Sequence, residues 1–331
     1  MRPKSPADLL RRASTSAFLV TDLTNIRYLT GLTLSAGVLL VLPRRFVLFV
    51  DSRYTQAAER AAAHYFAVED IATLQAALKK IRSVGFEAHK VTMERFGLWK
   101  KKFKSTKFVQ HMDIVEQFRR AKTDEERAIL KKAERITEEL LRRIPLALKK
   151  GITEEELARK ITIWALELGA EGMSFDPIVG FGTHTSAPHH RPTKRTLKKG
   201  HIVQIDIGAK YRGYSADRSE VFFTATPSPI VQKVYDTLCE ARDTVMEMAV
   251  PGASTHALDR AARKVLAREG IEYAFTHALG HGVGLDIHEG VSISSKGKDE
   301  KLVRGEVITV EPGVYFPGKF GMRVESMVYV E

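Results

Sequence analysis

The sequence feature that most constrains this chain is a pair of aspartates placed around a short turn, within segments that are otherwise apolar. Asp206 lies in IVQIDIG, Asp217 lies in YSADRSE, and KYRG between them is typical of a hairpin turn. If the turn is centred between residues 211 and 212, Asp206 faces Asp217 across two antiparallel strands. Ionised carboxylates with Cβ atoms about 5 Å apart repel each other, and a cation removes that repulsion. The pattern also fits a solvent face that Asp206 shares with Gln204 and Gly208.

Two glutamates and a histidine extend this set. Glu311 in VITVEPGVY and Glu325 in MRVESMVYV each lie inside an apolar, strand-like segment, where a lone carboxylate is costly to bury. His281 lies in HALGHGVGLDIHE, where glycines on both sides of the histidine allow close approach of the backbone. Taken singly, exposure on an edge strand explains either acid, and a structural role explains the histidine.

Together the five residues form a donor set rich in carboxylates, with one imidazole and no sulfur: Asp206, Asp217, His281, Glu311 and Glu325. Such a set suits hard or borderline divalent ions such as manganese or cobalt better than a structural zinc. Four carboxylates match the charge of two divalent ions, and two ions roughly 3.5–4 Å apart activate a bridging water and stabilise a tetrahedral intermediate. Charge balance therefore predicts two metal ions per chain.

The N-terminal third of the chain alternates strand-like and helix-like segments. FLVTD, GVLLVLP and FVLFVD are typical of buried strands, and helical patterns cover 56–63 and 74–81. This alternation predicts an α/β domain over residues 1–121.

The remaining two thirds have a different rhythm. From Thr123 to about Lys150 apolar residues recur at helical spacing, and a second helix begins at Thr153, where Glu156 completes a capping box. Strands such as IVQIDIG and SEVFF then mix with helical segments at 229–249 and 256–269, without a βαβ rhythm. The sequence therefore predicts an α+β domain with an antiparallel sheet over residues 122–331.

The charge distribution limits the range of partners. The net charge is +12, but residues 1–120 hold 21 Lys and Arg against 10 Asp and Glu, whereas residues 121–331 hold 31 against 30. The densest lysine run, between residues 100 and 107, is interpreted as a solvated helix or loop face, with contact to an acidic partner as the alternative, and we do not expect nucleic acid as a partner. With the single cysteine Cys239 and no segment of roughly 18 apolar residues, we expect a cytoplasmic protein that does not bind membranes.

Five segments carry a resemblance to a known family: FDPIVGFGTHTSAPHH, IDIGAKYRGYSAD, HALGHGVGLDIHE, VEPGVYFPG and MRVES. They resemble, in order, the active-site motifs of the pita-bread metallopeptidases, which include prolidase, aminopeptidase P and methionine aminopeptidase. The N-terminal third, with NIRYLTG and FVDSRYTQAAER, resembles the creatinase-like extra domain of the Xaa-Pro members. The resemblance implies a pita-bread catalytic domain, a homodimer, and small peptide substrates with proline at the second position.

The resemblance also implies roles for single residues. The five donors named above would bind two divalent ions, manganese first, with cobalt or zinc as alternatives, and Glu311 would assist the water that attacks the peptide bond. Three histidines match family histidines that contact the substrate or stabilise the tetrahedral intermediate: His189, His277 and His288. Arg323 and Tyr214 match positions that support the ligands.

The chain departs from the family pattern in two places. After Asp217 the usual Thr-Arg appears as Ser219-Glu220, which keeps the hydroxyl and reverses the charge, and Glu289 is followed by Gly290 where proline is usual. The compact length favours an Xaa-Pro dipeptidase over an aminopeptidase P that acts on longer peptides. A non-catalytic binding module of the same fold is the remaining alternative, and the complete acidic set argues against it, because such a cluster destabilises a domain that holds no metal.

Overall fold

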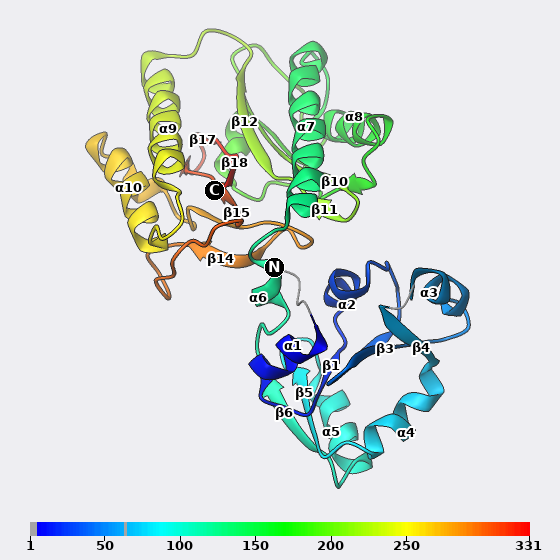
Figure 1. Ribbon diagram of the computed structural model, residues 1–331. Coiled ribbons are helices and arrows are strands. Elements are labelled where there is room, and N and C mark those ends of the chain that lie inside the picture. The colour runs from blue at the N-terminus through cyan, green and yellow to red at the C-terminus, as the bar shows by residue number, and fades with distance from the viewer. Residues whose placement is uncertain (1–4, 63–64) are drawn as a thin grey trace. The chain divides into compact units, whose positions relative to one another are not determined.

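The structure is a computed structural model that describes residues 5–62 and 65–331. The chain divides into two units, Met1–Arg119 and Arg120–Glu331 (Figure 1). The last residue of the helix expected at 56–63 and the first four residues of the expected 1–121 domain lie outside the described residues.

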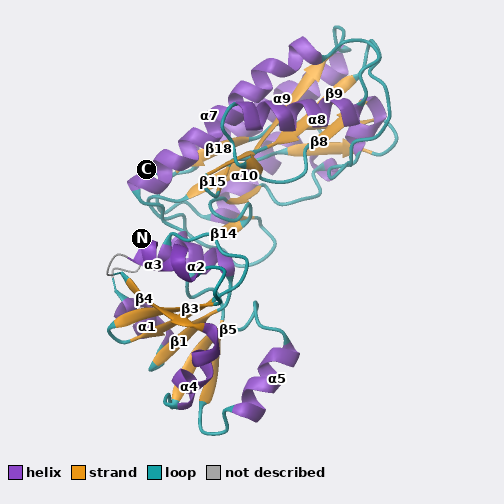
Figure 2. Ribbon diagram, turned by 90° about the vertical axis from the view of Figure 1, so that its right-hand side faces the viewer, coloured by secondary structure: helices purple, strands orange, loops and turns teal. Residues whose placement is uncertain are grey.

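The first unit is built on one mixed sheet flanked by helices (Figure 2). Its strands are β1 (Ala17–Val20), β2 (Val38–Leu42), β3 (Arg45–Val50), β4 (Phe66–Asp70), β5 (Ser83–Glu87) and β6 (Lys107–His111). Its helices are α1 (Pro6–Ala13), α2 (Leu23–Thr30), α3 (Thr55–Ala62), α4 (Leu74–Lys79), α5 (Met93–Lys102) and α6 (Glu116–Arg119). The strand order β4-β3-β2-β1-β5-β6 combines antiparallel pairing of β1 with β2 and parallel pairing of β1 with β5, so the expected α/β arrangement is confirmed.

Helix α5 explains the position of the lysine run. The rings of Phe96 and Trp99 pack on Phe86 of β5, with centroids 5.1 and 5.6 Å apart, so the aromatic side of the helix faces the sheet. The lysines between residues 100 and 107 are all exposed. This exposure agrees with a solvated face and also leaves the lysines accessible to an acidic partner.

The second unit consists of four long helices and short antiparallel strands. The helices are α7 (Asp124–Ala147), α8 (Glu154–Glu167), α9 (Pro229–Met248) and α10 (Thr255–Arg268). The strands in its first half are β7 (Gly172–Met173), β8 (Ile178–Phe181), β9 (Ile202–Ile207), β10 (Ala209–Tyr211), β11 (Tyr214–Ser215) and β12 (Arg218–Phe223). Those in its second half are β13 (Gly280–Gly282), β14 (Glu289–Ile293), β15 (Val307–Val310), β16 (Gly313–Phe316), β17 (Phe320–Arg323) and β18 (Ser326–Tyr329). Every pairing among them is antiparallel, as predicted.

Two hydrophobic cores organise this unit. Helices α7 and α8 lie side by side and share one core with β8 and β9, and α9 and α10 lie side by side and share the other with β14, β15 and β17 (Figure 1). The capping box predicted at Thr153 is present, because Glu156 N donates to Thr153 Oγ1 and Thr153 N donates to Glu156 Oε2. Among the helices described, none combines the length and the apolar character needed to span a membrane.

The predicted hairpin register is wrong by two positions. Tyr211 pairs with Tyr214, because Arg212 and Gly213 both have positive φ and form the turn, so Asp206 pairs with Ser219 and not with Asp217. Positive φ at both central residues is the geometry of a type I′ turn, which matches the twist of the strands. Asp217 nevertheless lies on the same side as Asp206, because moving the pairing register by two residues does not change which side chains point to that face.

The prediction that the two glutamates lie inside strands is wrong. Glu311 directly follows β15, and Glu325 lies between β17 and β18, which divide the segment that the sequence suggested as one strand. β17 pairs with β16, and β18 pairs with β15, so the chain changes partner at Val324 and Glu325. Both acids therefore project from strand ends.

Candidate metal centre

Five segments of the second unit bring the predicted donors together. Donor atoms of Asp217, His281 and Glu325 lie within 4.8 Å of one another. His281 Nε2 lies 3.5 Å from Asp217 Oδ2 and 3.6 Å from Glu311 Oε1. Asp206, on β9, acts electrostatically on Asp217, Glu311 and Glu325.

Backbone contacts determine which nitrogen of His281 faces the acids. Its Nδ1 lies 3.1 Å from the carbonyl oxygen of Gly282, which can only accept a hydrogen bond. Nδ1 therefore carries the proton, and in the neutral ring Nε2 presents its lone pair to the acids, as a metal ligand must. The flanking glycines permit this packing, since a Cβ at Gly280 would lie 2.0 Å from the Thr309 carbonyl oxygen and one at Gly282 2.1 Å from that of Glu289.

The acids are buried and repel one another. Burial raises the pKa of Asp217 well above its ordinary value, and the nearby Asp206 and Glu311 carboxylates add to this effect. Burial likewise raises the pKa of Glu325 well above its ordinary value, and it raises the pKa of Glu311 to about 7. Such shifts mean that the ionised forms of the acids are poorly compensated by the protein itself.

One cation of the protein reaches the cluster, and it leaves a carboxylate oxygen unsatisfied. Arg323 is buried; its Nη2 donates to Asp206 Oδ2, and its Nε lies 3.9 Å from Glu311 Oε2. The other oxygen of Asp206, Oδ1, is buried without a hydrogen-bond partner. An orphaned carboxylate oxygen beside three further acids is the environment that a divalent ion completes, so the residues fit the predicted metals.

The three predicted histidines differ in what their ring nitrogens contact. His277 is engaged on both sides, because Nδ1 lies 2.7 Å from the Ala278 carbonyl oxygen and Nε2 lies 3.2 Å from the Tyr315 hydroxyl. Burial, with Arg323 nearby, lowers the pKa of His277 to about 4, so the ring is neutral. Within residues 5–62 and 65–331, no hydrogen bond engages the ring of His189 or His288.

His189 and His288 nevertheless belong to the same locality. The ring of His288 packs edge-on against that of His281, with centroids 4.1 Å apart. Burial lowers the pKa of His288, and the charges of His281 and His189 contribute in the same direction. His189 also contributes to the lowered pKa of His277, so all three histidines lie around the acids.

The two supporting residues proposed from the sequence have different surroundings. Arg323 contacts the acids directly. The hydroxyl of Tyr214 donates to Oε1 of Glu126 on α7, at 2.7 Å, and this hydrogen bond ties it to that helix.

Sequence reasoning did not identify Tyr315 and assigned no role to Ser219. The Tyr315 hydroxyl accepts a hydrogen bond from Arg323 and contacts His277, and Ser219 Oγ lies 3.0 Å from Glu325 Oε2 and accepts from Arg323 Nε at 2.9 Å. A signal existed for Ser219, which follows Asp217 by two residues and pairs with Asp206, but none existed for Tyr315, which lies on β16, beyond the strand that Glu311 follows.

Comparisons with known proteins agree with this geometry. The model of "Metallopeptidase family M24" matches residues 128–331, and that of "Creatinase/Prolidase N-terminal domain" matches residues 2–121. A curated Xaa-Pro dipeptidase of Pyrococcus furiosus is 30% identical over 309 residues, which cover 92% of this chain and 88% of that protein.

Two solved structures extend the likeness over nearly the whole chain. The prolidase of Pyrococcus horikoshii has a TM-score of 0.93 at 28% identity, covering 98% of this chain and 94% of that one. The X-Pro aminopeptidase of Thermotoga maritima has a TM-score of 0.89 at 32% identity, covering 97% and 94%. This chain belongs to metallopeptidase family M24, whose members use divalent metal ions, and it carries a creatinase/prolidase-type N-terminal domain.

Proposed function

We propose that this protein is a metal-dependent Xaa-Pro dipeptidase, which hydrolyses the bond between an N-terminal residue and proline. The observation that carries the proposal is the convergence of Asp217, His281 and Glu325 with the unsatisfied Oδ1 of Asp206 in a buried site. The relatives named Xaa-Pro dipeptidase and prolidase support the substrate class. An Xaa-Pro bond lacks the N–H on which general peptidases rely, so it calls for a dedicated enzyme.

The proposed metal ligands are those predicted from the sequence: Asp206, Asp217, His281, Glu311 and Glu325. Two divalent ions, when bound, supply an activated water and the positive charge that balances the acids. Glu311 is proposed to take the proton of the attacking water. His189 and His288, whose rings make no hydrogen bond within the described chain, are proposed to donate to the substrate carbonyl as negative charge develops on it. His277, whose Nδ1 lies 4.0 Å from Glu311 Oε2, is likewise proposed to contact the substrate or stabilise the tetrahedral intermediate.

Metal content and hydrolysis together test the catalytic proposal. Protein purified with manganese is expected to hold about two ions per chain and to hydrolyse Xaa-Pro dipeptides. Asp217→Ala is expected to lose metal and to abolish hydrolysis, because it removes a buried donor. The matched control is Asp236→Ala, which truncates an exposed aspartate on α9 and is expected to behave as wild type. A folded wild type that binds no metal would contradict the proposal.

An aminopeptidase P is the second candidate function, and the structural likeness to the Thermotoga maritima X-Pro aminopeptidase favours it. The discriminating assay compares an Xaa-Pro dipeptide with the same peptide extended by one residue. A dipeptidase is expected to show a higher kcat/KM on the dipeptide. Equal or better cleavage of the tripeptide would assign the protein to the aminopeptidases.

Three finer properties are also proposed. Manganese is proposed as the native metal because the donors are mostly carboxylate oxygens. A homodimer is proposed from the resemblance to the Xaa-Pro peptidases. A cytoplasmic location is proposed because the single cysteine, Cys239, excludes an intrachain disulfide.

A further inference from the structure

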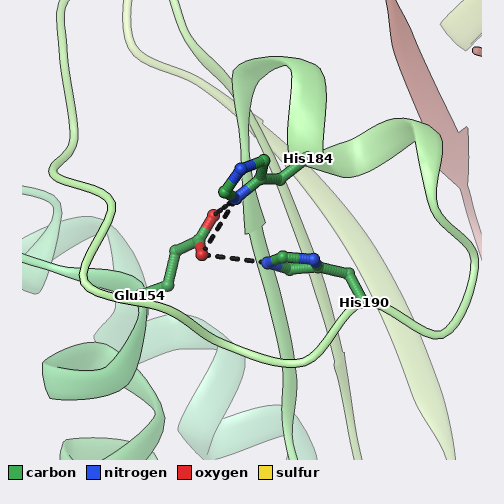
Figure 3. A group of neighbouring side chains, drawn as sticks. All are labelled: Glu154, His184 and His190. Atoms are coloured by element: carbon green, nitrogen blue, oxygen red, sulfur yellow. Dashed lines mark hydrogen bonds and ion pairs between the residues drawn. The ribbon is translucent and has the colours of Figure 1, made fainter. Parts of the chain in front are cut away.

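A second cluster of an acid and two histidines lies at the start of α8, apart from the five donors. Glu154, in the first turn of α8, is fully buried. Its Oε1 lies 2.9 Å from His184 Nδ1, and its Oε2 lies 2.9 Å from His190 Nε2 (Figure 3). Figure 3 shows both rings directed at the carboxylate, that of His184 from the 3₁₀ helix Gly182–Ser186 and that of His190 from the loop that follows.

The carboxylate of Glu154 also accepts hydrogen bonds from both ends of the segment 181–193, which is called loop 181–193 below. Oε1 accepts from the Phe181 N–H at 2.8 Å, and Oε2 accepts from the N–H and the hydroxyl of Thr193 at 3.0 and 2.7 Å. Burial acts to raise the pKa of Glu154, but the hydrogen bonds from His190 and Thr193 outweigh it and lower the pKa below its ordinary value. The ionised carboxylate is therefore the form that these donors stabilise.

The distances indicate hydrogen bonds and not ligands spaced around an ion. Two ligands that each lie about 2.1 Å from a tetrahedral zinc are about 3.4 Å apart. The nitrogens of His184 and His190 are closer than this to the Glu154 oxygens, whereas His281 lies 3.5 and 3.6 Å from its two acids. The Glu154 cluster thus differs in kind from the metal centre.

His189 lies between residues that this network and Arg323 hold in place. The carbonyl of Pro188, before it, accepts from Arg323 Nη1 at 3.4 Å. His190, after it, is bound to Glu154 through its ring and to the Ala187 carbonyl through its N–H at 3.1 Å. The backbone of His189 is therefore restrained on both sides, while its own ring makes no hydrogen bond within the described chain.

We propose that Glu154 is a positioning residue for hydrolysis, which holds His189 at the metal centre through its hydrogen bonds to both ends of loop 181–193. The proposal rests on the proposed peptidase function and on the role proposed for His189. Glu154 contacts neither substrate nor metal. Its effect on the rate arises because a donor displaced by about 1 Å can cost about 100-fold in rate.

The first test is a double-mutant cycle on the manganese-loaded enzyme with an Xaa-Pro dipeptide. Glu154→Gln replaces one acceptor oxygen by an N–H₂ group, and we expect kcat to fall about 10- to 100-fold with KM changed less than about threefold and two ions still bound. In a His189→Ala background the same change is expected to cost less than about twofold, because there is no longer a ring to position. Equal losses in both backgrounds, or no loss in either, would overturn the proposal.

Conservative and control variants separate positioning from folding. His190→Gln keeps an N–H donor near the place of Nε2, whereas His190→Leu removes it, so we expect the glutamine variant to retain most of the activity that the leucine variant loses. This pair carries the test if Glu154→Gln does not fold. Glu155→Gln is the matched control, since the neighbouring glutamate is partly exposed and its nearest cation, Arg159, is 4.0 Å away. A leucine variant as active as the glutamine variant would contradict the proposal.

Two readouts do not depend on peptidase activity. The imidazole NMR signals of His189, assigned with His189→Ala, are expected to shift in Glu154→Gln and to stay unchanged in Glu155→Gln. If the wild type is inactive but this shift occurs, the proposed peptidase function is refuted. The effect of Glu154 on the position of the His189 ring is then still supported. When zinc is added to manganese-saturated protein, we expect no third ion to bind. Binding of a third ion that is lost in His190→Leu would show that the Glu154 cluster is a metal site and would overturn the hydrogen-bond role.

Discussion

Ser219 and Glu220 are adjacent in the sequence, but only the Ser219 side chain contacts the cluster of acids. The Ser219 hydroxyl bridges Arg323 and Glu325, whereas Glu220 turns to the other face of β12 and accepts from the Tyr235 hydroxyl of α9 at 3.2 Å. Strand alternation separates them. The charge that differs from the family pattern therefore lies away from the proposed metal ligands, and the hydroxyl that is kept lies among them.

The contacts of the Ser219 hydroxyl lead to a testable prediction. Ser219→Ala leaves buried groups of Arg323 and Glu325 without a partner, so we expect it to lower the free energy of unfolding by about 1–3 kcal/mol and to weaken metal binding. Glu220→Gln, the control on the opposite face, is expected to leave metal affinity unchanged. Urea denaturation and manganese titration measure both effects, and equal metal affinities for the two variants would count against the assigned contacts.

The raised pKa of Glu311 predicts a pH dependence for the metal-free protein. With its pKa at about 7 against an ordinary 4.5, folded Glu311 binds more protons than unfolded Glu311. Its contribution to the free energy of unfolding therefore falls as pH rises from about 4.5 to about 7. Relative to wild type, metal-free Glu311→Gln should become more stable over this range, by roughly 2–4 kcal/mol.

Urea denaturation in EDTA across this pH range tests the comparison. His277, whose pKa burial lowers to about 4, acts in the opposite direction and lies 4.0 Å from Glu311, so the comparison is repeated in a His277→Gln background. Manganese should remove the advantage of the variant, because bound metal requires the carboxylate ionised. A stability difference that is independent of pH in EDTA would show that Glu311 ionises freely.

At the scale of elements, the glycines of β13 determine how closely the strands approach. A Cβ at Gly282 would lie 2.1 Å from the carbonyl oxygen of Glu289, which is backbone and cannot move aside alone. We expect Gly282→Ala to lower the free energy of unfolding by at least about 2 kcal/mol and to impair metal binding through the adjacent His281.

The matched control is a glycine with room around it. Gly97 lies inside α5, and a Cβ there meets nothing within 4 Å. Gly97→Ala is expected to stabilise the protein by about 0.5–1 kcal/mol, because alanine loses less backbone entropy in a helix. Thermal unfolding measures both variants; similar melting temperatures for the two would refute the packing argument.

At the scale of the whole molecule, the proposed homodimer gives a direct prediction. One chain has a mass of 37.1 kDa, so light scattering coupled to gel filtration is expected to give about 74 kDa, twice that value. The mass is expected to stay the same after treatment with EDTA, because none of the proposed ligands is required from a second chain. A mass near 37 kDa would show a monomer.

Local patterns in the sequence were sufficient for the main elements and for naming the candidate donors. Capping boxes such as Thr153 with Glu156, and helical or strand periodicity, depend on near neighbours, so the long helices α7 to α10 and the most apolar strands were predicted, whereas α1, α2, α5, α6 and most of the short strands were not. The four acidic donors could be named because acids in apolar segments are unusual wherever the chain places them, and His281 could be named from the glycines around it.

Only the tertiary structure decided how these residues are used. The left-handed conformation of Arg212 and Gly213 set the hairpin register, and a change of strand partner placed Glu325 at a strand end. Contacts between distant segments brought Nε2 of His277 to the Tyr315 hydroxyl and joined Glu154 to the loop that carries His189. Hydrogen bonds and buried charges depend on distance in space, and separation along the chain does not reveal it.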